Sequence, residues 1–238
     1  MHYPFDLSGN FGILQGKLEL KVAVLTCFEN SISGIILAGG RSTRLNGVDK
    51  GGLSLGPWNP MERIYSIFSK IFDEIILVTN DPVRHLGWDL LIVTDLFDLR
   101  SSLTGLQAGL FSASSPYVFC VACDMPFINR RAVAEMASMA GLPWDVVIPE
   151  TPAGLEPLFA VYSKRCLPAF ERSLRRGRLK IQASFKRLKV KKVRPEVWQK
   201  WDPEFESFFN INTPEDLEAA RRKAASLEPS GRHEDDRT

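Results

Sequence analysis

GIILAGGRSTRLNGVDK, residues 34–50, begins with a short apolar run and continues into a loop with two glycines. Continuous apolar runs of this length are typical of buried strands in parallel sheets, which other elements cover on both faces. Gly39 and Gly40 lack a Cβ, so their backbone N–H groups can approach an anion closely. Three cations follow on the same loop: Arg41, Arg44 and Lys50. The spacing is neither that of a P-loop nor that of a dinucleotide fingerprint, so taken alone an ordinary strand-to-helix turn explains it equally well.

Further apolar runs follow this one, and amphipathic stretches separate most of them. The expected strands are residues 34–38, 73–79, 90–94, 117–123, 145–149, 156–162 and 188–193. The expected helices are residues 60–72, 104–113, 129–141, 166–177 and 213–225. Thr213 as N-cap, Pro214 at the first helical position and Asp216 three residues after the cap mark the start of the last helix. This alternation predicts an α/β fold with a single doubly wound, mostly parallel sheet and helices on both faces, as in Rossmann-like proteins.

Length and composition suit one globular domain, since the chain has 238 residues, of which 45% are hydrophobic and 24% charged. We expect residues 1–32 to form a weakly ordered extension, 33–225 the domain and 226–238 a disordered tail. No apolar stretch reaches the ~18 residues that a membrane span needs, so we expect no membrane contact. The chain has four cysteines, and such sparse use favours a cytoplasmic protein over a disulfide-built one.

Cys120 and Cys123 form a C-x-x-C pair, which in other contexts indicates zinc binding or redox chemistry. Here the pair lies within YVFCVACD, residues 117–124, a run with strand character. Residues three apart on a strand point to opposite faces, so the two thiols cannot easily share a metal. We therefore interpret them as small buried apolar residues.

Polar residues follow several of the expected strands. In doubly wound sheets ligands bind beyond the carboxyl ends of the strands, where Asn80, Asp95 and Asp124 are expected beside the glycine loop. Asp124 follows a buried strand, and an unpaired carboxylate there would be costly to desolvate. Mg²⁺ would satisfy it, because this ion uses one or two carboxylates together with substrate phosphates, although a turn cap near Pro126 is an alternative. Cations, a metal carboxylate and a phosphate cradle together indicate phosphoryl or nucleotidyl transfer.

Positive charge is concentrated in residues 164–194, which hold thirteen basic residues against one acidic residue, Glu171. The segment therefore carries +12 while the whole chain carries +2, so the remainder is acidic. Such asymmetry predicts an anionic partner for this face, although a solvated basic surface is the alternative for its outer residues. Nucleic acid is not the expected partner, because few aromatic residues are available there for base stacking.

The glycine loop, in the longer form LAGGRSTRLNGVDKGGLSL (37–55), resembles the signature of the molybdenum cofactor guanylyltransferase (MobA) family of nucleotidyltransferases. The resemblance continues in order through five further motifs: TD (94–95), LTG (103–105), CDMPF (123–127), EPLFAVY (156–162) and FFNINTPEDL (208–217). LAGG in place of the LAAG of related cytidylyl- and sugar-nucleotidyltransferases favours the guanylyl branch. The sequence departs from the family pattern at Leu45, Asn46 and Ser102, the last bearing on selectivity for guanine.

The resemblance implies the transfer of GMP from GTP to Mo-molybdopterin, giving molybdopterin guanine dinucleotide and pyrophosphate with Mg²⁺ as cofactor. It implies a nucleotide site made of Leu37, Ala38, Gly39, Gly40, Lys50, Asn80, Asp95, Leu103, Gly105 and Asp124. The pterin substrate would meet Arg178, Lys180, Asn210 and Asn212. Arg44, Lys50 and Asp124 are the expected catalytic residues, with Asp124 as the metal ligand.

In such a reaction, the terminal phosphate of one substrate attacks the α-phosphorus of the other, so cations and in-line positioning supply most of the catalysis. No protein nucleophile is needed. The expected partners are GTP, the molybdenum cofactor and, transiently, cofactor-inserting or acceptor enzymes. Alternatives are a cytidylyl- or other nucleotidyltransferase of the same fold, or a non-catalytic relative that binds nucleotide.

Overall fold

The computed structural model describes residues 31–39, 55 and 59–226, and this part of the chain contains an eight-stranded sheet. The strands are β1 (Ile32–Leu37), β2 (Ile75–Val78), β3 (Leu91–Val93), β4 (Tyr117–Ala122), β5 (Val146–Thr151), β6 (Gly154–Leu155), β7 (Phe159–Ser163) and β8 (Val190–Val193). Their order in space is β3-β2-β1-β4-β7-β5-β6, and β8 pairs with β5.

Strand direction confirms the mostly parallel sheet that the sequence predicts. β1 pairs in parallel with both β2 and β4, β2 in parallel with β3, and β5 in parallel with β8. β7 is antiparallel to both of its neighbours, β4 and β5, and the short β6 forms a hairpin with β5. Among the described strands β8 pairs with β5 alone, so this basic strand lies at an edge of the sheet.

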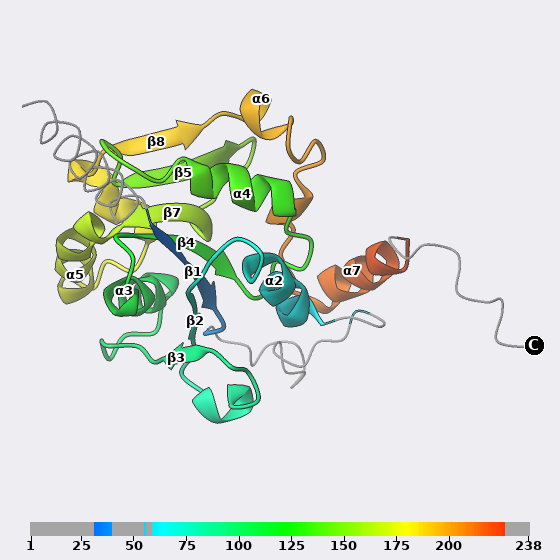
Figure 1. Ribbon diagram of the computed structural model, residues 1–238, viewed down its shortest axis with the longest axis horizontal. Helices are drawn as coiled ribbons and strands as arrows, with labels where there is room; N and C mark the ends of the chain where they lie inside the picture. Colours follow the sequence, from blue (N-terminus) through cyan, green and yellow to red (C-terminus); the bar gives the residue numbers. More distant parts are fainter. Residues whose placement is uncertain (1–30, 40–54, 56–58, 227–238) are drawn as a thin grey trace, which may run out of the picture.

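Helices cover both faces of the sheet. They are α2 (Pro60–Phe68), α3 (Ser102–Ser112), α4 (Arg130–Ser138), α5 (Leu167–Arg175), α6 (Pro195–Trp198) and α7 (Pro214–Ser226). Figure 1 shows α3 and α5 on one side of the sheet and α2 and α4 on the other. Short 3₁₀ helices complete the described elements: η3 (Pro82–His85), η4 (Lys164–Cys166), η5 (Ile181–Arg187) and η6 (Glu206–Phe208).

Most expected elements are present, with different ends. The helix expected over 60–72 ends at Phe68, where Ser69 is the C-cap. The strand expected over 156–162 begins only at Phe159, because Glu156 starts a turn in which the Phe159 N–H donates to the Glu156 carbonyl at 3.2 Å. β6, α6 and the 3₁₀ helices were not predicted, since segments of two to seven residues show too little periodicity to be recognised.

β4 lies at the centre of the fold and divides its side chains between two cores. Tyr117, Phe119 and Val121 pack on the face covered by α2 and α4, whereas Val118 and Cys120 pack on the face covered by α3 and α5. This alternation follows from the two-residue period of a strand. Cys123 packs against the first core, so the two cysteines of the C-x-x-C pair belong to opposite faces, as predicted.

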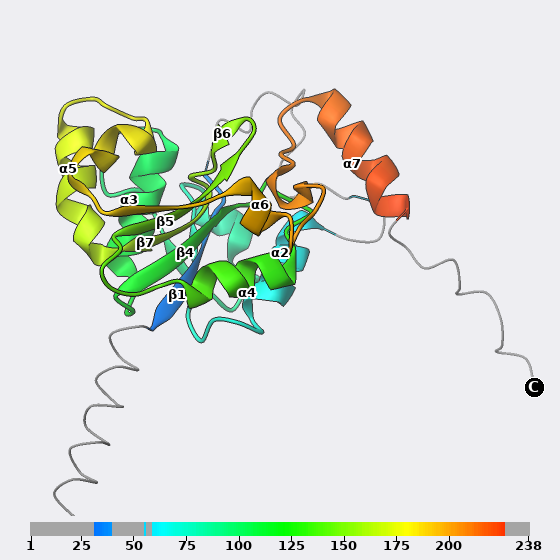
Figure 2. The same cartoon turned by 90° about the horizontal axis from the view of Figure 1, so that it is seen from above.

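α7 is attached through a third, smaller core at one end of the molecule (Figure 2). Its buried members are Leu55, Phe127, Ile211, Leu217, Ala220 and Ala224. The start of the helix has the predicted capping box, because the Asp216 N–H donates to Thr213 Oγ1 at 3.1 Å and the Thr213 N–H donates to Asp216 Oδ2 at 2.9 Å. α7 runs through Ser226, the residue at which the expected tail begins.

Residues 1–30 of the expected extension and residues 227–238 of the expected tail lie outside the described residues, whereas Ile32, at the end of the expected extension, already belongs to β1. The domain limits therefore stay predictions. In the part of the chain that the structure describes, no helix is long and apolar enough to cross a membrane.

Two glycines let elements approach more closely than any other residue would allow. A Cβ at Gly109 of α3 would lie 2.8 Å from Ile35 Cδ1 and 2.9 Å from Val78 Cγ2. A Cβ at Gly34 of β1 would lie 2.6 Å from a ring atom of Phe68. Such distances are too short for real Cβ atoms. α3 can therefore pack this closely against β1 and β2 only because Gly109 has no side chain.

We expect the substitution Gly109→Ala to lower the free energy of unfolding by about 1–2 kcal/mol, since overpacking outweighs the better helix propensity of alanine. Urea unfolding measures the change. Gly87→Ala is the matched control, because a Cβ there meets no atom within 4 Å. Equal effects of the two substitutions would contradict the close approach of α3 to the sheet.

Candidate functional site

Four parallel strands, β1 to β4, end at the same edge of the sheet, and hydrogen bonds just past their ends hold the chain together there. The Ala38 N–H donates to the Val78 carbonyl at 2.8 Å, and the Cys123 N–H donates to the Leu37 carbonyl at 3.0 Å. Leu37 is buried and Gly39 is exposed. The glycine loop therefore leaves the sheet between the ends of β2 and β4, where ligands of open α/β sheets bind.

Asn80 and Asp95 follow β2 and β3, and they bind each other through two hydrogen bonds. Asn80 Nδ2 donates to Asp95 Oδ2 at 2.6 Å, and the Asp95 N–H donates to Asn80 Oδ1 at 3.1 Å. The pair confirms that the loops after these strands converge. Because both the oxygen and the nitrogen of the Asn80 amide bind Asp95, Asn80 holds the Asp95 carboxylate in position.

The Asp95 carboxyl group titrates above its ordinary range. Burial raises its pKa, and this effect exceeds the opposing effects of the Asn80 hydrogen bond and of the Arg100 charge. A carboxylate kept partly desolvated at a sheet edge interacts strongly with cations and hydrogen-bond donors, because few waters screen it.

α3 begins at this edge, and its N-terminus faces the same region. Ser101 is the N-cap, and its side chain accepts from the Thr104 N–H at 3.2 Å. Ser102 occupies the first helical position of α3, where proline would also be well tolerated. A Cβ at Gly105 would lie 3.4 Å from Leu37 Cδ2 and 3.6 Å from Asp95 Oδ1. Gly105 thus brings the first turn of α3 against Asp95, and Leu103 beside it is fully buried.

Asp124 follows β4, and its backbone carbonyl accepts a hydrogen bond from a segment that is far away in the sequence. The Ile211 N–H donates to the Asp124 carbonyl at 2.9 Å, and the Ile211 side chain is fully buried. Asn210 and Asn212 flank Ile211 and are partly or fully exposed. The Asn212 N–H donates to Asp216 Oδ2 at 3.0 Å, so the capping box of α7 also holds this segment. The structure therefore brings both asparagines beside Asp124.

The remaining expected site residues are not all at this edge. Gly40, Arg44 and Lys50 lie outside the described residues. Arg178 and Lys180 follow α5 and are exposed. Arg178 lines a pocket between α5 and η5, and Lys180 is not among the residues that line it. The role of both cations stays a prediction.

Glu156 is a candidate that the sequence analysis did not assign. It follows the β5–β6 hairpin, and because β5 runs parallel to β4 the hairpin extends from the same edge of the sheet. Burial raises the pKa of the Glu156 carboxyl against the effect of Thr151, whose Oγ1 donates to Glu156 Oε1 at 3.2 Å. As the one charged residue of EPLFAVY, it could have been recognised from sequence.

The edge offers oxygen ligands, which suit a hard cation. Asp124 is a carboxylate next to the expected path of substrate phosphates, and a single carboxylate is a sufficient protein contribution for Mg²⁺. Among the described residues no group of three or more histidine, cysteine, aspartate or glutamate side chains could hold a metal.

A parallel sheet with a glycine loop, an anchored Asn–Asp pair and a further aspartate at its carboxyl edge is the arrangement of a nucleotide-binding transferase. The chain belongs to the family of MobA-like NTP transferase domains, whose family model matches residues 34–191.

Individual relatives agree with this family. The molybdenum cofactor guanylyltransferase of Desulfosudis oleivorans is 41% identical over 191 residues, which cover 80% of this chain and 95% of the relative. A probable molybdenum cofactor guanylyltransferase of Natranaerobius thermophilus is 39% identical over 204 residues, which cover 84% of this chain and 99% of the relative.

A solved structure is also similar. The molybdopterin-guanine dinucleotide biosynthesis protein A of Archaeoglobus fulgidus superposes with a TM-score of 0.72 at 26% identity, covering 82% of this chain and 100% of that one. A CMP-2-keto-3-deoxy-manno-octonic acid synthetase bound to CTP superposes with a TM-score of 0.63 at 13% identity, which shows the shared fold alone.

We expect Asn80→Ala to raise the pKa of Asp95 further, because the variant loses the hydrogen bond that favours the charged carboxylate while the burial remains. Carbon-13 NMR titration of the Asp95 carboxyl group measures this shift. Arg100→Gln should raise the same pKa by less, since the Arg100 charge opposes burial less than the Asn80 hydrogen bond does. An unchanged or lower pKa in Asn80→Ala would show that the amide does not hold the carboxylate in solution.

Proposed function

We propose that this protein transfers GMP from GTP to Mo-molybdopterin, forming molybdopterin guanine dinucleotide and releasing pyrophosphate. The observation that carries the proposal is the meeting of three segments at one sheet edge: the Asn80–Asp95 pair, Asp124, and the asparagines on either side of Ile211. One side of this edge can hold a nucleotide and the other its acceptor. The names of the relatives supply the identity of the two substrates.

On the nucleotide side, the glycine loop from Leu37 to Gly40 would bind the phosphates through its N–H groups, and Asp95, held by Asn80, would orient the nucleoside. The N-terminus of α3, with Leu103 and Gly105, lies against Asp95 and would line the base. The positive end of the helix dipole at this N-terminus favours negative charge nearby.

On the acceptor side, Asn210 and Asn212 would orient the pterin substrate, and Arg178 and Lys180 would attract its charge. In the transfer, an oxygen of the terminal phosphate of the pterin substrate forms a bond to the α-phosphorus of GTP, while the bond to pyrophosphate breaks. Asp124 would hold Mg²⁺, which when bound neutralises charge on the phosphate oxygens. Arg44 and Lys50 would stabilise the charge that develops on the leaving pyrophosphate.

The product is a large, reactive cofactor, and direct transfer to an acceptor protein would protect it. We therefore include transient complexes with cofactor-inserting or acceptor enzymes in the proposal. Lys192 is a weaker candidate for such contacts than its charge suggests, because its Nζ already pairs with Glu150 Oε1 at 2.7 Å. Lys189 is exposed and remains available.

We expect purified protein to release pyrophosphate when GTP, Mg²⁺ and Mo-molybdopterin are present together, and to do so much more slowly with CTP. Asp124→Asn should reduce turnover by about two to three orders of magnitude, since loss of one electrostatic contact to the reacting groups commonly costs this much. The matched control is Asp89→Asn, because Asp89 is exposed and precedes β3, at the opposite edge of the sheet.

Faster turnover with CTP would replace the guanylyl assignment by a cytidylyl one on the same fold. Nucleotide binding without pyrophosphate release, in the presence of both substrates and Mg²⁺, would indicate a non-catalytic relative. Chelation of divalent ions should abolish turnover, and full activity in excess chelator would contradict the role given to Asp124.

A second test addresses the acceptor side. Asp216→Ala removes the carboxylate that accepts from both the Asn212 and Thr213 N–H groups, at 3.0 and 2.9 Å. We expect about 1 kcal/mol lower stability from the lost capping box, and a higher KM for the pterin substrate with little change in the KM for GTP. Glu215→Ala is the control on the same turn, and an equal rise of both KM values would contradict the division into two sides.

A further inference from the structure

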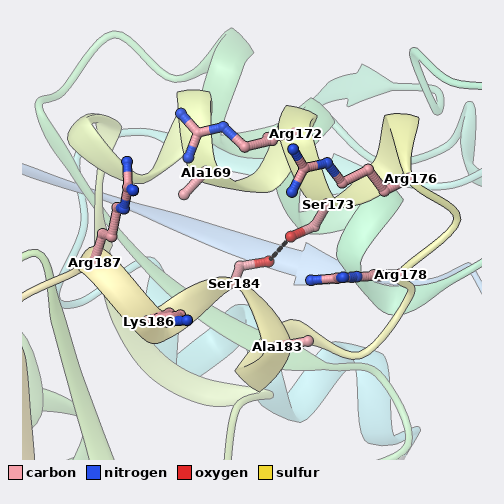
Figure 3. A pocket seen from close by; sticks show the side chains of 9 residues that line it. All are labelled: Ala169, Arg172, Ser173, Arg176, Arg178, Ala183, Ser184, Lys186 and Arg187. Atoms are coloured by element: carbon pink, nitrogen blue, oxygen red, sulfur yellow. Dashed lines mark hydrogen bonds between the residues drawn. The ribbon is translucent and has the colours of Figure 1, made fainter.

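A pocket of ≈ 450 Å³ lies between α5 and η5. Its lining residues are Ala169, Arg172, Ser173, Arg176, Arg178, Ala183, Ser184, Lys186 and Arg187. Figure 3 shows Arg176 and Arg178 reaching toward the pair of serines from one side, with Arg187 on the other. Ser184 Oγ donates to Ser173 Oγ at 2.8 Å, and both serines are buried, so they form a small polar floor beneath exposed cations.

The cations of this pocket differ from their neighbours in lacking anionic partners. In the basic segment 164–194, Arg165 pairs with Asp145 at 2.7 Å and Lys192 pairs with Glu150 at the same distance. Arg175, which does not line the pocket, approaches Glu171 at 3.9 Å. Within the described residues no carboxylate lies within ion-pairing distance of the five cations of the pocket: Arg172, Arg176, Arg178, Lys186 and Arg187.

The local sequence explains why these cations face one another. Ala169, Arg172, Ser173 and Arg176 are spaced three or four residues apart, so they lie along one side of α5. Gly177, at φ 64°, then turns the chain back, and the Arg178 N–H donates to the Ser173 carbonyl at 2.9 Å. This turn places η5 alongside α5, and Lys186 and Arg187 of η5 line the pocket together with the arginines of α5 and Arg178. Alanines at two lining positions leave the space open.

The pocket is separated from the proposed nucleotide site by α5 itself. Figure 1 shows α5 between α3, whose first turn contacts Asp95, and the segment that leads into β8. α5 packs against both α3 and η5. A group bound among the pocket cations would therefore lie across the helix from Gly105 and Asp95, not among the residues that hold the nucleotide.

We propose that the pocket between α5 and η5 is a second anion site, which binds a small molecule carrying two or more linked phosphates. Four of its five cations are arginines, whose planar guanidinium groups bind phosphate oxygens in pairs. The volume suits a small ligand, since pockets of 300–1,000 Å³ are typical of such sites. The lining holds no aromatic residue on which a nucleic-acid base could stack. The linked phosphates can come from a free oligophosphate or from a nucleoside polyphosphate.

This inference does not depend on the proposed function, because it concerns binding at residues other than those of the transfer reaction, apart from Arg178 at the rim. Its tests therefore leave Arg178 intact. They also measure binding rather than turnover, so that failure here would leave the guanylyltransferase proposal standing.

Isothermal titration with inorganic tripolyphosphate in excess chelator tests the site on the full-length protein. We expect Arg176→Gln combined with Arg187→Gln to weaken binding by about tenfold to a hundredfold, since each lost charged hydrogen bond typically costs about tenfold. Arg175→Gln is the matched control, because Arg175 is the same residue type on the same helix but does not line the pocket. It should leave the affinity unchanged. Circular dichroism confirms folding, and Arg172→Gln with Lys186→Gln gives an independent pair that should behave like the first.

The same titrations with GTP distinguish the two sources of phosphate. A loss of GTP affinity confined to the pocket variants would support a nucleoside polyphosphate, whereas loss for tripolyphosphate alone would support a free oligophosphate. Equal tripolyphosphate affinity in the wild-type protein and in both pocket variants would overturn the proposal. So would pocket-dependent binding of a hexaglutamate peptide in place of tripolyphosphate, since this would assign the pocket to an acidic protein segment.

Discussion

Parallel pairing of β1 between β2 and β4 is the constraint on which the rest of the structure depends. It brings the ends of four strands to one edge of the sheet. Residues that are far apart in the sequence therefore lie close together at this edge. The packing that maintains this pairing is tight, because α3 approaches β1 and β2 to a distance that only Gly109 permits. The position of α3 in turn sets where its N-terminus and Gly105 meet Asp95. A change in the seating of this helix would therefore be transmitted directly to the candidate site.

The site is held by polar contacts that orient its charged groups before any ligand arrives. Asn80 ties Asp95 between two strand ends, and Ile211 ties the asparagine segment to the backbone of Asp124. Preorganisation of this kind suits a reaction between two polyanions, in which positioning and charge stabilisation supply most of the rate. The pocket between α5 and η5 is a different kind of feature. Its cations face solvent, and none of them pairs with a carboxylate in the part of the chain that the structure describes. Like charges brought together in this way repel each other.

Much of this organisation was predictable from local sequence. The apolar runs at GIIL and YVFCVA, the helix caps at Thr213 and the aspartates after two strands each carry a signal that operates over a few residues. The ends of elements were less predictable, as at Phe68 and Phe159, because turns such as the one after Glu156 depend on contacts with other strands. Which cations line the pocket between α5 and η5 was not predictable from sequence either, because this depends on the turn that the chain makes at Gly177.

The sequence by itself determined the fold class, the parallel character of most of the sheet and the position of Asn80, Asp95 and Asp124 after its strands. These features follow from hydrophobic periodicity and from the order of strands and helices, which are short-range patterns in the sequence. Only the tertiary structure decided that β7 runs antiparallel to its neighbours and that Ile211 contacts Asp124. It also decided which cations of the basic segment form ion pairs and which line the pocket. These features join residues that are tens of positions apart, or depend on which carboxylates lie nearby. Their energies come from packing and from electrostatic contacts in three dimensions, which a linear pattern does not contain.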